Sequence, residues 1–166
     1  MKNRLFWRCF FLVAALLTAV LIFFFSSQDG EESSELSDGV TLEVAQIVRP
    51  DYKSLPRVEQ QSYLESLGGV VRKCAHFCEF ALLAFNLMFT FSLRRDDGRL
   101  RPSIPIAWGI ATLYAGTDEL HQRFVSDRGP ALLDVGIDSA GALTGALVAT
   151  VLLALLLCRA AKRSAR

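Results

Sequence analysis

The sequence predicts an all-α membrane protein, a bundle of four transmembrane helices that forms one domain over residues 1–166. Apolar residues make up 52% of the chain and the mean hydropathy is +0.33, and this excess lies mainly in a few long runs. An α-helix needs about 20 predominantly apolar residues to cross the hydrocarbon core of a bilayer. The net charge is only +1, so no overall field favours a nucleic-acid partner.

The first predicted span covers residues 9–25, with the sequence CFFLVAALLTAVLIFFF. Basic residues at positions 2, 4 and 8 precede it, as they would in a secretory signal peptide. The run is unbroken, however, and ends in three phenylalanines where cleavage would require small residues. We therefore expect an uncleaved transmembrane helix.

Residues 26–69 are predicted to form a long extracytoplasmic loop between the first and second spans. Its stretch SSQDGEESSELSDG is rich in serine and glutamate, which is typical of flexible loops. Beyond it, Val40, Val44, Ile47 and Val48 recur at helical spacing, which predicts a short amphipathic helix on the membrane surface or on the bundle. The alternative role for this segment is to bind a membrane-protein partner.

The other spans are predicted at residues 70–93, 104–123 and 132–158. The apolar part of the third, IPIAWGIATLYAG, is too short to cross about 30 Å of hydrocarbon. It reaches full length only if the helix continues through TDELH. The second and fourth spans begin with polar turns, RKCAHFCE and LLDVGID, before becoming uniformly apolar.

The basic residues of the short flanking segments predict the orientation of the spans, because cytoplasmic flanks are enriched in lysine and arginine. They lie before the first span, between the second and third, and after the fourth: Lys2, Arg4, Arg8, Arg94, Arg95, Arg99, Arg101, Arg159, Lys162, Arg163 and Arg166. Residues 26–71 instead hold nine acidic residues against three basic ones. Both termini are therefore expected in the cytoplasm.

With this topology, the polar residues of the last three spans all fall at the outer end of the bundle. Within each span they share one helical face, at spacings of three or four residues: Arg72, His76 and Glu79; Tyr114, Asp118 and His121; Asp134 and Asp138. Such stripes are tolerated in a membrane when they are buried against one another or line a wet cavity. We expect Lys73 to pair with Asp118, Glu119 or Asp134.

A divalent metal is a second use for this polar zone. His76, Glu79, Asp118 and His121 are compatible with zinc or a similar ion. No compact motif such as H-E-x-x-H supports a metal, and hydrogen-bonded structural histidines are the alternative. The cysteines of CAHFC are expected to be small apolar fillers. Gly141 and Gly145 form a small-xxx-small pattern that favours close helix packing.

The segments RKCAHFCEF and YAGTDELHQRFVSDRGPALLDVGIDSAGALTGAL resemble the VanZ-like family of bacterial membrane proteins, as does FFFSSQ after the first span. The resemblance implies a location in the bacterial cytoplasmic membrane and an association with glycopeptide resistance of the teicoplanin type. The family's motif positions fall on Lys73, His76, Glu79, Asp118, Glu119, Gln122, Arg128, Asp134, Asp138 and Gly141. His121 and the long segment 26–69 depart from the family pattern.

Three functions remain open at this stage. The polar residues could catalyse a reaction on a lipid-linked phosphate or sugar, with Glu79, Asp118 or Glu119 as acid or base. Phosphate charge would be neutralised by Lys73, Arg72 and Arg128. The polar residues could instead bind a membrane lipid or a lipid-linked envelope precursor without reaction. As a third alternative, they form a buried ion-pair network that sets helix register for a purely structural membrane protein.

Overall fold

The computed structural model describes residues 2–27, 30–93, 103–124 and 132–164. These residues form α1 (Lys2–Ser26), α2 (Gly30–Val48), a 3-10 turn η1 (Tyr52–Ser54), α3 (Arg57–Ser92), α4 (Ser103–Gln122) and α5 (Leu132–Ser164). The described part of the chain contains no strand. The predicted all-α class is confirmed.

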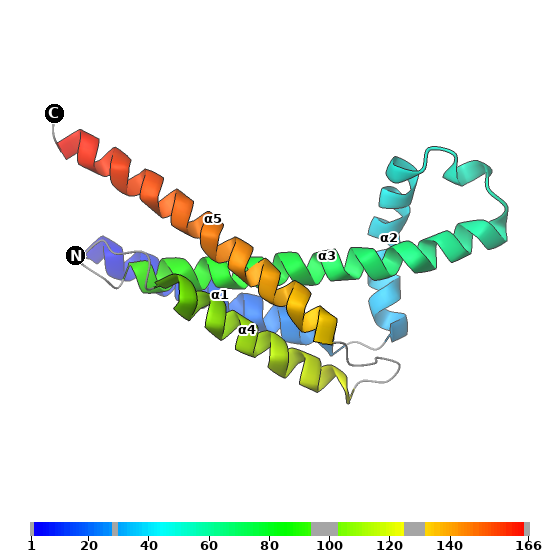
Figure 1. Cartoon of the computed structure of the whole chain (residues 1–166), viewed down its shortest axis with the longest axis horizontal. Coiled ribbons are helices and arrows are strands. Elements are labelled where there is room, and N and C mark those ends of the chain that lie inside the picture. The colour runs from blue at the N-terminus through cyan, green and yellow to red at the C-terminus, as the bar shows by residue number, and fades with distance from the viewer. Residues whose placement is uncertain (1, 28–29, 94–102, 125–131, 165–166) are drawn as a thin grey trace.

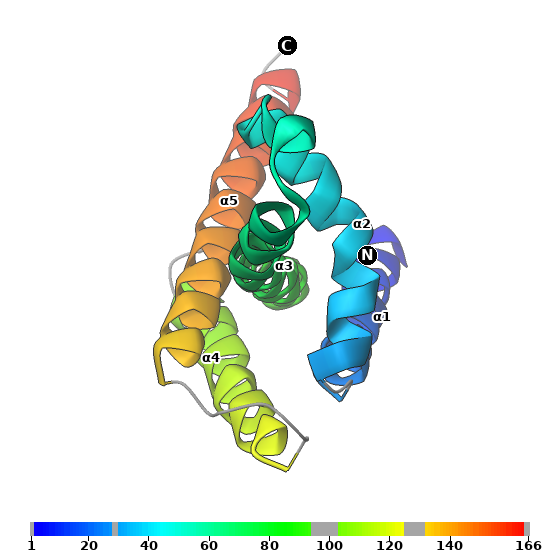
Figure 2. The ribbon, with the colours of Figure 1, turned by 90° about the vertical axis from the view of Figure 1, so that its right-hand side faces the viewer.

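Helix α3 lies at the centre of the molecule. Helices α1, α4 and α5 all pack against it, and α4 also packs along α5 (Figure 2). The two chain termini lie at one end of the bundle, whereas α1 and α4 finish and α5 begins at the opposite end (Figure 1). We call this second end the polar end, because the acidic residues of α4 and α5 lie in the turns of those helices nearest to it.

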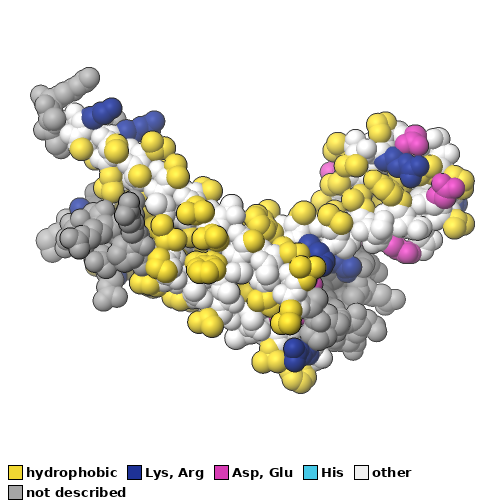
Figure 3. Space-filling view, viewed as in Figure 1, with side chains coloured by type: hydrophobic (Ala, Val, Ile, Leu, Met, Phe, Trp, Pro, Cys, Tyr) yellow, Lys and Arg dark blue, Asp and Glu magenta, His cyan; other side chains and the backbone are white. Residues whose placement is uncertain are grey.

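Three of the described helices are long and apolar enough to cross a membrane: Asn3–Ser26, Arg57–Ser92 and Leu132–Lys162. Their outward faces carry large apolar side chains, such as Leu16 and Val20 on α1 and Val151 and Leu155 on α5. Figure 3 shows hydrophobic side chains spread over α5 and the adjoining bundle. A soluble monomer rarely exposes so continuous an apolar surface, and contact with lipid explains it.

Helix α4 is not among these candidate spans, and its last turns carry the polar residues Asp118 and Glu119. It nevertheless packs along α3 and α5 within the bundle (Figure 1). Its buried face is made of alanines at every fourth position, Ala107, Ala111 and Ala115, each at most 1% exposed. Such small residues let neighbouring helices approach closely in a membrane, where packing rather than the hydrophobic effect drives association.

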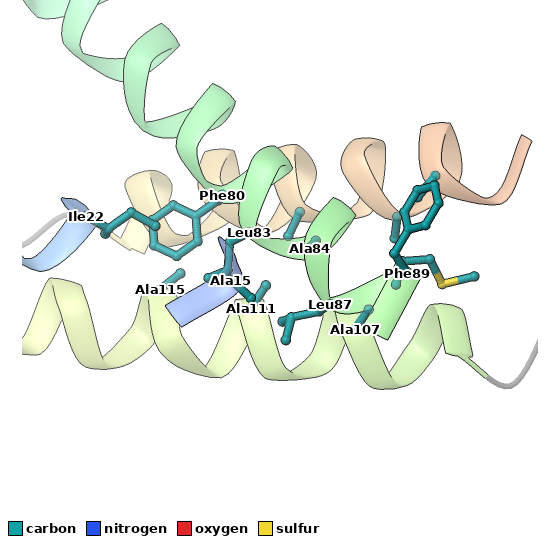
Figure 4. Close-up of a cluster of buried hydrophobic side chains, with 14 of the residues drawn as sticks. Ala15, Ile22, Phe80, Leu83, Ala84, Leu87, Phe89, Ala107, Ala111 and Ala115 are labelled. Atoms are coloured by element: carbon teal, nitrogen blue, oxygen red, sulfur yellow. The ribbon is translucent and has the colours of Figure 1, made fainter. Parts of the chain in front are cut away.

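The apolar core joins α1, α3, α4 and α5. Figure 4 shows Phe80 and Leu83 of α3 together with Ile22 of α1 and the alanines of α4. Nearer the end that holds the termini, the rings of Phe11 and Phe89 are stacked with their centroids 4.4 Å apart. These contacts hold α1 against α3 over much of its length.

The contact between α3 and α5 depends on two glycines. A Cβ atom on Gly145 would clash with the carbonyl oxygen of Ala81 and lie 2.6 Å from its carbonyl carbon. A Cβ on Gly141 would similarly clash with the carbonyl oxygen of Phe77. The predicted close packing through this glycine pair is confirmed.

Residues 26–69 contain more helix than predicted: the helix expected at residues 40–48 is confirmed as part of α2, whereas the prediction of a flexible stretch is wrong where α2 covers it. Helix α2 begins at Gly30, inside the stretch expected to be flexible, and buries Thr41 and Ala45. Helix α3 begins at Arg57, directly after Pro56, so residues 57–69 extend the second span beyond its apolar part. Hydropathy identifies the part of a helix that suits lipid, but it does not detect a helix that continues into water.

The other boundaries differ less. The predicted spans 9–25 and 132–158 correspond to longer helices, Lys2–Ser26 and Leu132–Ser164, which include basic residues beyond the apolar runs. The third predicted span, 104–123, matches α4 to within one residue at each end. Helix α2 and the first turns of α3 form an arm that projects from the polar end (Figure 1). In Figure 3, most acidic side chains in view lie on this arm.

Candidate functional site

The polar end brings together side chains from four helices. We call this group the polar cluster, and its described members are Ser26, Ser27, Lys73, His76, Glu79, Asp118, Glu119, His121, Gln122, Asp134 and Asp138. Asp118, Glu119 and Asp138 are buried, whereas Lys73 is exposed. The cluster therefore has a buried acidic interior with a basic residue on its surface.

Asp118 lies in the interior of the cluster and is 4% exposed. Its Oδ2 atom accepts hydrogen bonds from Ser26 Oγ at 2.8 Å and from Gln122 Nε2 at 2.9 Å. Ser26 is fully buried at the last turn of α1, so this bond ties the end of α1 to the end of α4. A second tie, from Tyr114 Oη to the carbonyl of Ala19 at 2.8 Å, lies one turn deeper.

Asp138 is the buried carboxylate of α5 and is 6% exposed. The carboxyl groups of Asp118, Asp134, Glu119 and Glu79 are close enough to interact with it electrostatically. Within the described residues, neither Asp138 Oδ1 nor Asp118 Oδ1 has a hydrogen-bond partner, although both atoms are buried. A buried acceptor without a donor is costly, and a buried negative charge without a partner is more so.

Lys73 forms an ion pair at the surface of the cluster. Its Nζ atom lies 2.7 Å from Asp134 Oδ1, and the two side chains are 45% and 35% exposed. This contact joins α3 to the first turn of α5. It confirms the expectation that Lys73 pairs with one of three acidic residues, and it identifies the residue as Asp134.

The two histidines belong to different helices and have different contacts. His76 Nδ1 is 3.8 Å from Glu79 Oε2, on the same face of α3. His121 Nε2 is 3.2 Å from Ser27 Oγ, and its imidazole ring lies 4.8 Å from the ring of Phe23. Both histidines are near enough to Asp118 to interact with its charge.

The described residues do not form a metal site. They contain no group of three or more His, Cys, Asp or Glu side chains placed to hold an ion. Of the four candidate ligands, His76 lies beside Glu79, while His121 contacts Ser27 on α1 instead. The four cysteines Cys9, Cys74, Cys78 and Cys158 are free and exposed.

Ser26 and Ser27 are the members of the cluster that residue-by-residue analysis of charge did not identify. In the sequence they are marked only by the SSQ after the first apolar run, which belongs to the family resemblance. Ser139 is a further addition, because its hydroxyl contacts both Thr112 Oγ1 and Trp108 Nε1 at 3.0 Å and thereby links α4 to α5. Arg128 lies outside the described residues.

The cluster offers mainly hydrogen-bond acceptors. Of its donors, Lys73 contacts Asp134, and both Ser26 and Gln122 donate to Asp118. Ser27 Oγ is 2.6 Å from the carbonyl of Phe23, one turn back along α1, and also contacts His121. This arrangement suits the binding of a group that donates hydrogen bonds or carries positive charge.

Comparison with known proteins identifies the family of the chain. The family model described as VanZ/LLP1 matches residues 11–155, a range that includes every member of the polar cluster. No similar protein was found among curated proteins, and none among solved structures. The chain belongs to the VanZ/LLP1 family.

Proposed function

We propose that this protein is a multi-pass protein of the bacterial cytoplasmic membrane whose polar cluster binds the headgroup of an envelope amphiphile at the outer leaflet. The observation that carries the proposal is the pair of buried carboxylates, Asp118 and Asp138, each with an unpartnered oxygen in the described structure. A purely structural network would gain stability by satisfying these atoms internally. Their retention favours a ligand that supplies the missing donors.

The proposed topology has four spans, with α4 as the third and both termini in the cytoplasm. Two features support it: α4 packs along α3 and α5, and the two termini lie at the same end of the bundle. The basic flanks assigned to the cytoplasm would then lie at that end, by the positive-inside rule. The polar cluster would face the outer leaflet, beside the headgroups.

The test compares a deletion strain with strains that express the wild-type chain, Asp118→Asn or Asp38→Asn. Asp38 is exposed on α2, so its substitution makes the same chemical change outside the cluster. Binding predicts that a lipid species copurifies with the wild type and Asp38→Asn but not with Asp118→Asn, at unchanged membrane abundance. A fall in abundance of Asp118→Asn that matches the loss of lipid would instead indicate a structural role.

The same strains test catalysis on a lipid-linked phosphate or sugar. An enzyme would produce an envelope lipid species that is present only with the intact protein, so lipid profiles of whole envelopes distinguish reaction from binding.

Resistance is tested separately. We propose that the wild type raises the teicoplanin concentration needed to inhibit growth of the deletion strain and that Asp118→Asn does not. Equal inhibition of all strains would remove resistance from the proposal.

A further inference from the structure

The buried acidic interior of the cluster identifies the chemical class of the headgroup. The geometry points to a primary ammonium group, held between the unpartnered carboxylate oxygens of Asp118 and Asp138, as the recognised part of the amphiphile. This inference rests on the proposed function and specifies its ligand. It concerns the two buried carboxylate oxygens, Asp118 Oδ1 and Asp138 Oδ1.

The first step is that these two oxygens need donors. Asp118 is only 4% exposed and Asp138 only 6% exposed. Their Oδ1 atoms have no hydrogen-bond partner within the described residues. Asp118 Oδ2 already accepts two hydrogen bonds from neutral groups, so the unmet demand is at Oδ1. The two carboxyl groups belong to different helices, α4 and α5, and lie within electrostatic range of each other.

The second step is that the missing donor carries positive charge. Glu79 and Glu119 add further negative charge around Asp138. Lys73, at the surface, already lies 2.7 Å from Asp134. Bonds from a cationic donor to a carboxylate are about twice as strong as those between neutral groups. An uncharged hydroxyl could donate a hydrogen bond but would bring no positive charge to these carboxylates.

The third step is that an ammonium group suits these two oxygens better than a metal ion does. Among the described residues, no group of three or more His, Cys, Asp or Glu side chains is placed to hold an ion. An ammonium group needs only acceptors, and it presents three N–H donors that two or three oxygens can share. A quaternary amine such as choline has the same charge but no N–H donor, so it makes a stringent comparison.

The experiment measures lipid binding to the full-length protein in detergent micelles by native mass spectrometry. The probes are phosphatidylethanolamine, phosphatidylcholine and phosphatidylglycerol with identical acyl chains. The wild type should bind phosphatidylethanolamine about tenfold more tightly than either of the others, a free-energy difference of about 1.4 kcal/mol. Soluble phosphoethanolamine is included as a competitor, because effective competition would show that the amine headgroup suffices without a lipid anchor.

Two variants complete the test. Asp138→Asn should abolish the preference for phosphatidylethanolamine, whereas Glu59→Gln, an exposed acid on α3, should leave it unchanged. Because the lipid comparison uses the wild type, the inference stays testable even if Asp138→Asn does not accumulate. Equal binding of phosphatidylcholine and phosphatidylethanolamine by the wild type would overturn the ammonium assignment. Preferential binding of phosphatidylglycerol that is lost in Asp138→Asn would overturn the ammonium assignment but leave the proposed headgroup binding intact. If no lipid binds in a way that depends on the cluster, both the ammonium assignment and the proposed headgroup binding are overturned.

Discussion

At the scale of single residues, the polar cluster separates neighbouring side chains with different roles. Ser26 is completely buried and donates to Asp118, whereas Ser27, the next residue, is exposed and contacts His121. Lys73 and Asp134 form an ion pair in which the two side chains remain 45% and 35% exposed. Burial, more than residue type, decides how much each interaction contributes to stability.

Ser26→Ala should destabilise the protein by about 1–3 kcal/mol, because it leaves a buried carboxylate oxygen with one donor fewer. Ser27→Ala removes an exposed hydroxyl and should change the free energy of unfolding by about 0.5 kcal/mol or less. Thermal unfolding of the purified protein in one detergent provides the comparison. Equal shifts in Tm for these adjacent serines would contradict the role assigned to the Ser26–Asp118 bond.

The Lys73–Asp134 pair should contribute little to stability despite its short distance. Exposed ion pairs typically contribute about 0.2–1 kcal/mol, since water screens the charges and the long side chain loses freedom. A double-mutant cycle with Lys73→Gln and Asp134→Asn measures the coupling energy directly. A coupling above about 2 kcal/mol would show that the pair is more desolvated in the bilayer than its exposure indicates.

At the scale of elements, the interface between α3 and α5 depends on missing side chains. Gly141 and Gly145 lie directly against the backbone of Phe77 and Ala81, so a Cβ atom at either position has no room unless the helices separate. Helix α4 uses alanines for the same purpose against the core. Close backbone contact of this kind sets the separation of the helices, and thereby the positions of Lys73 and Asp134.

Gly145→Ala should destabilise the bundle by about 1–3 kcal/mol, the usual cost of overpacking. Gly136→Ala is the matched control on the same helix: nothing lies within 4 Å of its added Cβ, and alanine favours a helix over glycine by up to about 1 kcal/mol. The two variants should therefore shift Tm in opposite directions. If Gly145→Ala also raises Tm, the close α3–α5 contact is not present in the membrane.

At the scale of the whole molecule, the proposed four-span topology would place the arm and the C-terminus on opposite sides of the membrane. In a variant whose four native cysteines are replaced by serine, Val58→Cys on the arm should react with a membrane-impermeant maleimide added to intact cells. Ala161→Cys, near the end of α5, should react only after the membrane is permeabilised. Labelling of both positions in intact cells would contradict the proposed topology.

Several features were predictable from the sequence because they depend on composition along one helix. Long apolar runs identify the helices that suit lipid, and the spacing of His76 with Glu79 already places them on one face of α3. The glycine pair at Gly141 and Gly145 indicated a close helix contact for the same reason. Lys73 was expected to pair with an acid because opposite charges rarely remain apart in a low-dielectric environment.

The sequence by itself determined that this chain is helical and membrane-type, and that its polar residues form one stripe on each of three helices. Only the tertiary structure decided which side chains meet, Asp134 with Lys73 and Ser26 with Asp118, and that helix α2 covers most of the stretch expected to be flexible. The physical reason is that periodicity specifies the face of a helix, whereas partners depend on the rotation and separation of neighbouring helices. Those are set by packing contacts between residues far apart in the chain, such as Gly145 with Ala81.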